Sequence, residues 1–136
     1  SHGTLLKADL LVSDESETFL NVIIQAGVCA QHRDVLELDN HLKQIEKNFE
    51  KMEGQIFSDS ICDLFDSILY FYRDLHLLKH SGDEKLLFYQ NKKEALKDCL
   101  RYPLPSLEQV LKKIENSREA IDLNLPLSQV LSHVFI

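Results

Sequence analysis

A long apolar stretch over residues 58–81 constrains what this chain can fold into more than any other feature. We expect one helix there, because Ser60 and Asp63 resemble a capping box at its start and Gly82 suits the left-handed residue at its end. Its apolar side chains would occupy nearly every side of the helix: Leu64, Phe65, Ile68, Leu69, Tyr70, Phe71, Tyr72, Leu75, Leu77 and Leu78. A helix that is apolar all round must be covered by other elements, so we place it at the centre of a bundle.

The composition favours a helical domain. The chain has 136 residues, of which 44% are hydrophobic, enough for one domain with its own core. Four glycines and three prolines are too few for the many turns of a sandwich or barrel. Further helical patterns cover residues 14–30, 35–52, 92–101, 106–121 and 127–134. We therefore expect an all-α fold, a bundle of about six helices joined by short connections.

The second helix has the most regular pattern. Its apolar residues recur at spacings of three and four and form one stripe: Val35, Leu38, Leu42, Ile45, Phe49 and Met52. Such a stripe packs against another helix, either within this domain or, in an adaptor protein, on a partner. A stripe of under three heptads favours packing inside the domain.

Three local signals refine this pattern. Gly27 lowers helix propensity inside the first helix, and therefore predicts a close approach of another helix. Ser106 and Gln109 form a second capping box, which opens a helix with Leu107, Val110, Leu111, Ile114 and Ile121 facing inward. Pro126 predicts the first turn of the last helix.

The chain is expected to contain a single domain. Residues 1–3 look like a remnant of recombinant expression, and residues 4–14 read as a lead-in from a missing N-terminal portion. Residues 15–136 would then form one helical domain.

The charge and the cysteines exclude several classes. A net charge of −7 disfavours a free-standing nucleic-acid binder. The first forty residues hold seven acids and two bases, a net charge of −5, which is either a solvated face or a docking face for a basic partner. Cys29, Cys62 and Cys99 have no paired spacing, so we expect buried thiols in a reducing compartment, the cytoplasm. Residues 18–31 are uncharged but too short to span a bilayer.

No segment carries a recognisable catalytic motif. The glycine-rich loops that hold phosphates or dinucleotides are missing, and so is the nucleophile elbow of hydrolases. His76 and His80 are spaced to share one helix face and could supply two ligands to a metal, but the HExxH pattern is absent. We expect no catalytic, cofactor or metal site, and keep a metal-dependent helical enzyme as a hypothesis.

Four polar or amphipathic residues are candidates for a subunit interface: Tyr70, Arg73, Asp74 and Arg118. Arg73 and Asp74 interrupt the apolar helix, and either belong to a buried polar network, meet a neighbouring subunit, or lie on a wet edge. Arg118 could pair with Glu115 on a solvated face, or contact a partner. Tyrosine and arginine are frequent anchors at interfaces.

Two stretches resemble a known family. Residues 70–84, which include Tyr70-Phe71-Tyr72-Arg73-Asp74-Leu75, resemble the aromatic-x-Arg-Asp-Leu segment in the C-terminal domain of the bacterial DNA polymerase III delta-prime subunit. Residues 114–127, which include Arg118-Glu119-Ala120-Ile121, resemble the closing Arg-x-Ala-Ile pattern of that domain. The resemblance covers roughly residues 16–136.

The resemblance implies a clamp-loader collar domain. Such domains pack side by side in a ring of five subunits that loads the sliding clamp onto primed DNA, so the implied partners are the gamma/tau and delta subunits. No nucleic acid, membrane, small molecule or cofactor is implied for this domain. A generic helical adaptor, or the collar domain of gamma/tau or delta, is the alternative.

Overall fold

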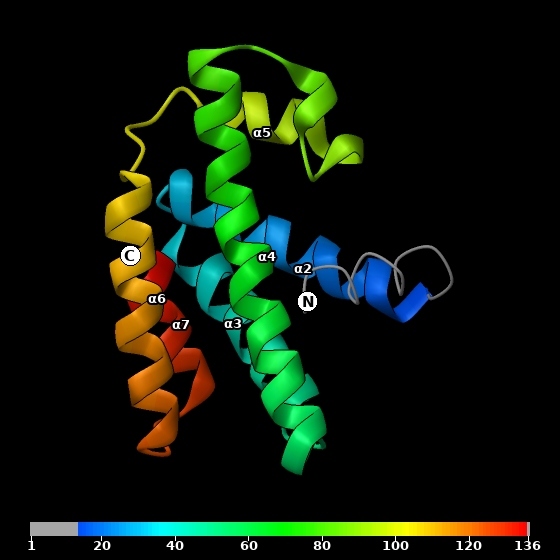
Figure 1. Cartoon of the computed structure of the whole chain (residues 1–136), viewed down its shortest axis with the longest axis vertical. Coiled ribbons are helices and arrows are strands. Elements are labelled where there is room, and N and C mark those ends of the chain that lie inside the picture. The colour runs from blue at the N-terminus through cyan, green and yellow to red at the C-terminus, as the bar shows by residue number, and fades with distance from the viewer. Residues whose placement is uncertain (1–13, 136) are drawn as a thin grey trace.

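The computed structural model describes residues 14–135, with side chains from residue 21 onward. The expected remnant at residues 1–3 and most of the expected lead-in, residues 4–13, lie outside this range. Within it the chain forms six α-helices and no strand, which confirms the all-α prediction (Figure 1). The helices are α2 (Asp14–Gln31), α3 (Val35–Phe49), α4 (Gly54–His80), α5 (Lys93–Cys99), α6 (Leu107–Asp122) and α7 (Leu127–Phe135). Two short 3₁₀ turns, η1 (Glu84–Leu86) and η2 (Gln90–Lys92), connect α4 to α5.

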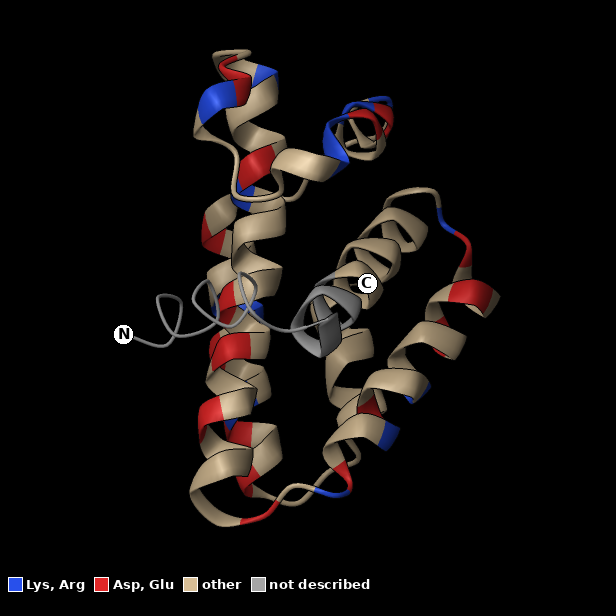
Figure 2. Cartoon of the chain, turned by 90° about the vertical axis from the view of Figure 1, so that its right-hand side faces the viewer, with Lys and Arg blue, Asp and Glu red and all other residues tan. Residues whose placement is uncertain are grey.

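Five of the helices close into a ring of contacts. α2 packs on both α3 and α4, α3 packs on α7, α7 packs on α6, and α6 returns to α4. α5 covers one end, where it contacts α4 and α2. Figure 2 shows the bundle from the side, with acidic positions spread along its length. The apolar faces of elements far apart in the sequence therefore share one core.

Helix α4 begins earlier than its capping signal predicts. Its first residue is Gly54, whose φ of +60° turns the chain into the helix, and the cap residue Glu53 makes no side-chain capping bond. The start expected at Ser60 is wrong, because the added turn is packed: the Phe57 ring meets the Phe49 ring of α3 edge-on at 6.2 Å. The end agrees with prediction, since Gly82 has a φ of +68° and donates its N–H to the Leu77 carbonyl (3.1 Å).

The predicted central position of α4 needs correction. The helix is buried over much of its length, but Asp66, Tyr70, Arg73 and Leu77 follow one another at helical spacing and all keep exposed surface. Helix α4 therefore packs against other helices on most of its circumference, but one side of it is exposed to solvent. It is not a central helix covered on every side.

Gly27 marks a close contact between α2 and α4, as predicted. A methyl group added at Gly27 would lie 2.5 to 2.9 Å from three carbon atoms of the Phe71 ring. Phe71 is fully buried on α4 and packs edge-on against Tyr72. The lack of a side chain at Gly27 is what lets the ring reach the α2 backbone.

The apolar stripe of α3 is part of the core. Leu38, Leu42, Ile45 and Phe49 are buried, while Val35 at the first turn is 59% exposed. On the neighbouring face, Glu46 accepts hydrogen bonds from the backbone N–H and the hydroxyl of Ser128, at 3.1 and 3.3 Å. This side chain holds the start of α7 against α3.

The last two helices follow their capping signals closely. Ser106 and Gln109 form the predicted capping box, but Leu111, predicted inward, is 46% exposed. Asn124 has a φ of +62° and reverses the chain after α6, a role the sequence analysis did not assign. Pro126 is predicted to lie in the first turn of the last helix, but it immediately precedes α7, which begins at Leu127. The Pro126 carbonyl accepts the N–H of Val130, the first backbone hydrogen bond of α7.

Candidate subunit interface on helices α4 and α6

The open side of α4 holds two of the four candidate residues. Arg73 is exposed, and Tyr70 is half-buried beside it. The Tyr70 ring stacks on the Phe88 ring, with centroids 4.5 Å apart and planes 15° from parallel. Because this stacking restricts its motion, Tyr70 presents a fixed aromatic edge next to a free cation.

Asp74, the third candidate, points into the protein. Its side chain is fully buried, and its carboxylate accepts the backbone N–H groups of Phe88 (3.0 Å) and Tyr89 (2.9 Å). Burial raises the pKa of the Asp74 carboxyl, while these two amides and Arg73 act in the opposite direction. The expected interface role of Asp74 does not fit this burial. The sequence allows three interpretations of the Arg73–Asp74 pair: a buried polar network, a contact with a neighbouring subunit, or an exposed edge of the helix. Asp74 belongs to a buried network, whereas Arg73 lies on the surface.

The buried network extends beyond Asp74. Tyr89, a residue the sequence analysis missed, donates its hydroxyl to the Ser67 carbonyl at 2.8 Å, and Ser67 donates its hydroxyl to the Asp63 carbonyl at 2.7 Å. The segment between η1 and η2 is therefore held to α4 at two points, by the Asp74 carboxylate and by the Tyr89 hydroxyl. We call these two attachments the clasp. This clasp fixes Phe88, and through Phe88 it fixes Tyr70.

Arg118, the fourth candidate, lies on α6 and is half-buried against α4. Its guanidinium lies over the Phe65 ring, 5.2 Å from the centroid, and donates to the Cys62 sulfur at 3.5 Å. The ion pair considered with Glu115 does not occur among the described residues. The structure thus joins Tyr70 and Asp74 through Phe88, whereas Arg118 is anchored at a separate point on α4.

The histidine pair on α4 is occupied with other contacts. The rings of His76 and His80 stack at 5.8 Å, and His76 Nε2 lies 2.7 Å from the Pro105 carbonyl. A metal would need further ligands, and no group of three or more His, Cys, Asp or Glu residues in the described part of the chain could hold one. The contact with Pro105 instead ties α4 to the loop before α6.

Comparison with known proteins leaves the chain without an assigned family. No protein-family model, no characterised protein and no solved structure matches it. Among residues 14–135, no helix combines the length and the apolar character needed to cross a membrane.

Proposed function

We propose that this chain is the collar domain of a bacterial clamp-loader subunit of the delta-prime type. In this proposal it acts in the cytoplasm and holds its subunit in the pentameric ring through contacts with the collar domains of gamma/tau and delta. It performs no chemistry itself, and it contacts neither DNA nor a membrane.

The observation that carries the proposal is how the two family-like stretches lie. Residues 70–84 fall on the second half of α4 and the turn after it, and residues 114–127 fall on the second half of α6 and the turn after it; α4 and α6 pack on each other as helices. Arg118 joins the helices through Phe65 and Cys62. Both stretches therefore belong to one pair of packed helices, which supports the proposal because the motifs of the resemblance are packing motifs.

The open side of α4 offers a surface of the right character. Tyrosine and arginine are enriched at protein interfaces, and Tyr70 and Arg73 are neighbours on a rigid helix. Leu69 and Leu77, partly buried against the core, add apolar area beside them. A rigid aromatic surface next to a free cation suits a stable contact between subunits.

The test is binding to purified gamma/tau and delta subunits. The chain should associate with them at micromolar concentration, and Arg73→Glu should weaken association at least tenfold, because it reverses a charge at the surface. Lys47→Glu, the same change at an exposed position of α3, is the matched control and should bind as the wild type. No association by a folded wild-type chain would refute the proposal.

The same assay separates the alternatives. Intact delta-prime subunit should displace the chain from the assembly; displacement by delta or gamma/tau instead would assign the collar to one of those subunits. The adaptor hypothesis requires the apolar stripe of α3 to be available to a partner. Four of the six residues of this stripe are buried in the core of the domain, so the stripe is not available.

A further inference from the structure

A pocket of about 300 Å³ lies where the turn between α2 and α3, the loop between α5 and α6, and the C-terminal end of α7 meet. In Figure 1 these segments converge near the point marked C. The wall includes Gln31, Arg33, Tyr72, Leu104, Lys113 and Phe135, and none of the interface candidates. An apolar cavity of about 150 Å³ already holds benzene, so there is room here for an apolar side chain and a polar group together.

Tyr72 brings an unused hydroxyl to this wall. The residue is 1% exposed, yet its hydroxyl makes no hydrogen bond with any residue that the structure describes. Tyr89, the other buried tyrosine of the described region, donates to a carbonyl. Burial raises the pKa of Tyr72 well above its usual value, so the hydroxyl stays protonated and available as a donor. A tyrosine hydroxyl that makes no hydrogen bond with the described residues and lies in a pocket wall can donate to a bound group.

Gln31 gives the pocket a firm edge and a second polar atom. It is 7% exposed, and its amide Nε2 donates to the carbonyls of Cys99 (3.3 Å) and Pro103 (3.4 Å), which holds the loop after α5 in place. Its Oε1 accepts no hydrogen bond from the described residues. This free acceptor suits the N–H of a peptide.

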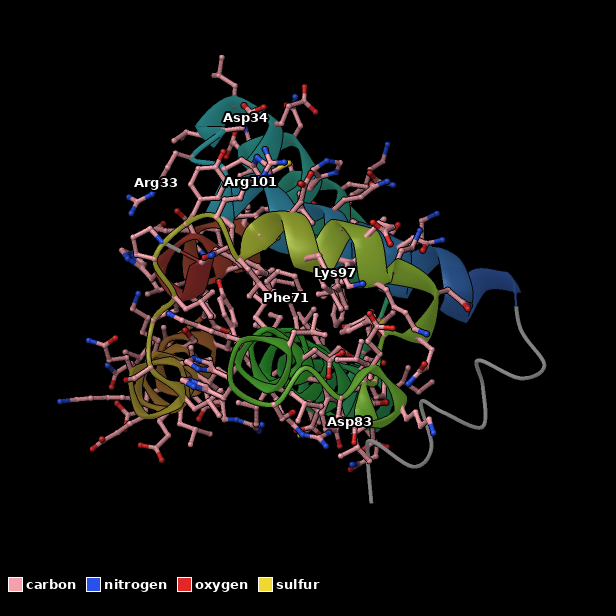
Figure 3. The ribbon with its side chains drawn as sticks, turned by 90° about the horizontal axis from the view of Figure 1, so that it is seen from above. Arg33, Asp34, Phe71, Asp83, Lys97 and Arg101 are labelled. Carbon is pink, nitrogen blue, oxygen red and sulfur yellow. The ribbon has the colours of Figure 1, made fainter. Side chains whose placement is uncertain are left out.

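Two cations line the pocket without ion-pair partners in the described part of the chain, Arg33 and Lys113. Figure 3 shows Arg33 extended outward at the edge of the molecule, and the residue is exposed to solvent. Arg33 has a φ of +63°, uncommon for a residue with a side chain. The one acidic residue of the lining, Asp34, already accepts the N–H of Glu37 at the start of α3.

We propose that this pocket binds the C-terminal residue of a partner polypeptide, with an apolar side chain inserted and the terminal carboxylate at the mouth. The Tyr72 hydroxyl and the Lys113 ammonium bind the carboxylate, and Arg33 attracts it from solvent. The apolar side chain packs on Leu104 and Phe135. Gln31 Oε1 accepts the N–H of the same residue. Capture of a chain terminus by converging donors is an established mode of peptide recognition.

The experiment measures binding of acetyl-Gly-Ser-Gly-Leu with a free carboxylate by NMR shift titration of the chain. The same peptide as a C-terminal amide should bind at least tenfold more weakly. Tyr72→Phe, which removes only the unbonded hydroxyl, and Lys113→Gln should each weaken binding about tenfold, the loss expected for one hydrogen bond to a charged group. Lys112→Gln, an exposed neighbour outside the pocket, is the matched control and should leave binding unchanged.

Any of four results would overturn the proposal, and the first three are no shifts around the pocket, equal binding of acid and amide, and equal effects of Lys112→Gln and Lys113→Gln. N-acetyl-leucine binding as tightly as the peptide would also overturn it, by assigning the site to a free small carboxylate. The pocket does not involve Tyr70, Arg73 or Arg118. Its failure and the failure of the collar proposal are therefore separate results.

Discussion

Replacing Gly27 with alanine sets two opposed effects against each other. Alanine in the interior of a helix is worth about 1 kcal/mol more than glycine. Here, however, its methyl carbon would lie 2.5, 2.6 and 2.9 Å from atoms of the Phe71 ring, where carbon atoms need about 3.5 Å. A shift of roughly 1 Å is required of a fully buried ring, and such overpacking costs about 1–3 kcal/mol.

We expect the overpacking cost to be the larger effect, because the Phe71 ring is fully buried and packs edge-on against Tyr72. Gly27→Ala should destabilise the fold by up to about 2 kcal/mol, which for a domain of this size lowers Tm by up to roughly 8 °C. Thermal and urea unfolding followed by circular dichroism measure both quantities.

A double-mutant cycle identifies the cause. In a Phe71→Leu background the clash is relieved, so Gly27→Ala should become neutral or stabilising by up to about 1 kcal/mol. Gly82→Ala is the control: its φ is +68° and nothing lies within 4 Å of the added carbon, so its cost of about 1 kcal/mol should be the same in both backgrounds. A stabilised Gly27→Ala single variant, or an equal cost with and without Phe71, would refute the reasoning.

Four further predictions concern the clasp and one helix cap. Asp74→Ala leaves the amides of Phe88 and Tyr89 without an acceptor and should cost about 2–3 kcal/mol, with faster hydrogen exchange at both amides; unchanged exchange would contradict this. Because burial raises the pKa of Asp74, the folded chain binds a proton at this carboxyl more readily than the unfolded chain does. The stability of the wild type relative to Asp74→Ala should therefore increase as the pH falls from neutral toward the ordinary pKa of aspartate. A stability difference that does not change with pH would contradict this prediction. Tyr89→Phe should cost about 1–2 kcal/mol in urea unfolding, through the lost bond to Ser67, and no loss would show that bond to be idle. Ser106→Ala should cost about 1 kcal/mol by the same assay, with recovery in Ser106→Asp.

The helices themselves could be predicted from local pattern. Apolar spacing placed all six, and short-range chemistry correctly gave the capping box at Ser106 and the left-handed Gly82. Both signals depend on residues within one or two turns of the chain. The start of α4 was misplaced because it depends on the contact between Phe57 and Phe49, which belong to different helices.

The candidate interface was only partly predictable. Adjacent positions such as Arg73 and Asp74 point to different sides of a helix, but the sequence does not state which side another element covers. The amides that hold Asp74 come from a segment that is placed only once the chain has folded. The pocket was not foreseen at all, because Gln31, Tyr72 and Lys113 come from three separate helices and share no spacing pattern.

The bond between Glu46 and Ser128 has a consequence for synthesis of the chain. The two residues are 82 positions apart, and a ribosome adding about 5–20 residues per second needs roughly 4–16 s to pass from one to the other. During that interval the face of α3 that packs on α7 has no cover from α7. The nascent domain therefore exposes apolar surface for seconds, long enough for a ribosome-associated chaperone to bind it, and release should coincide with the emergence of α7.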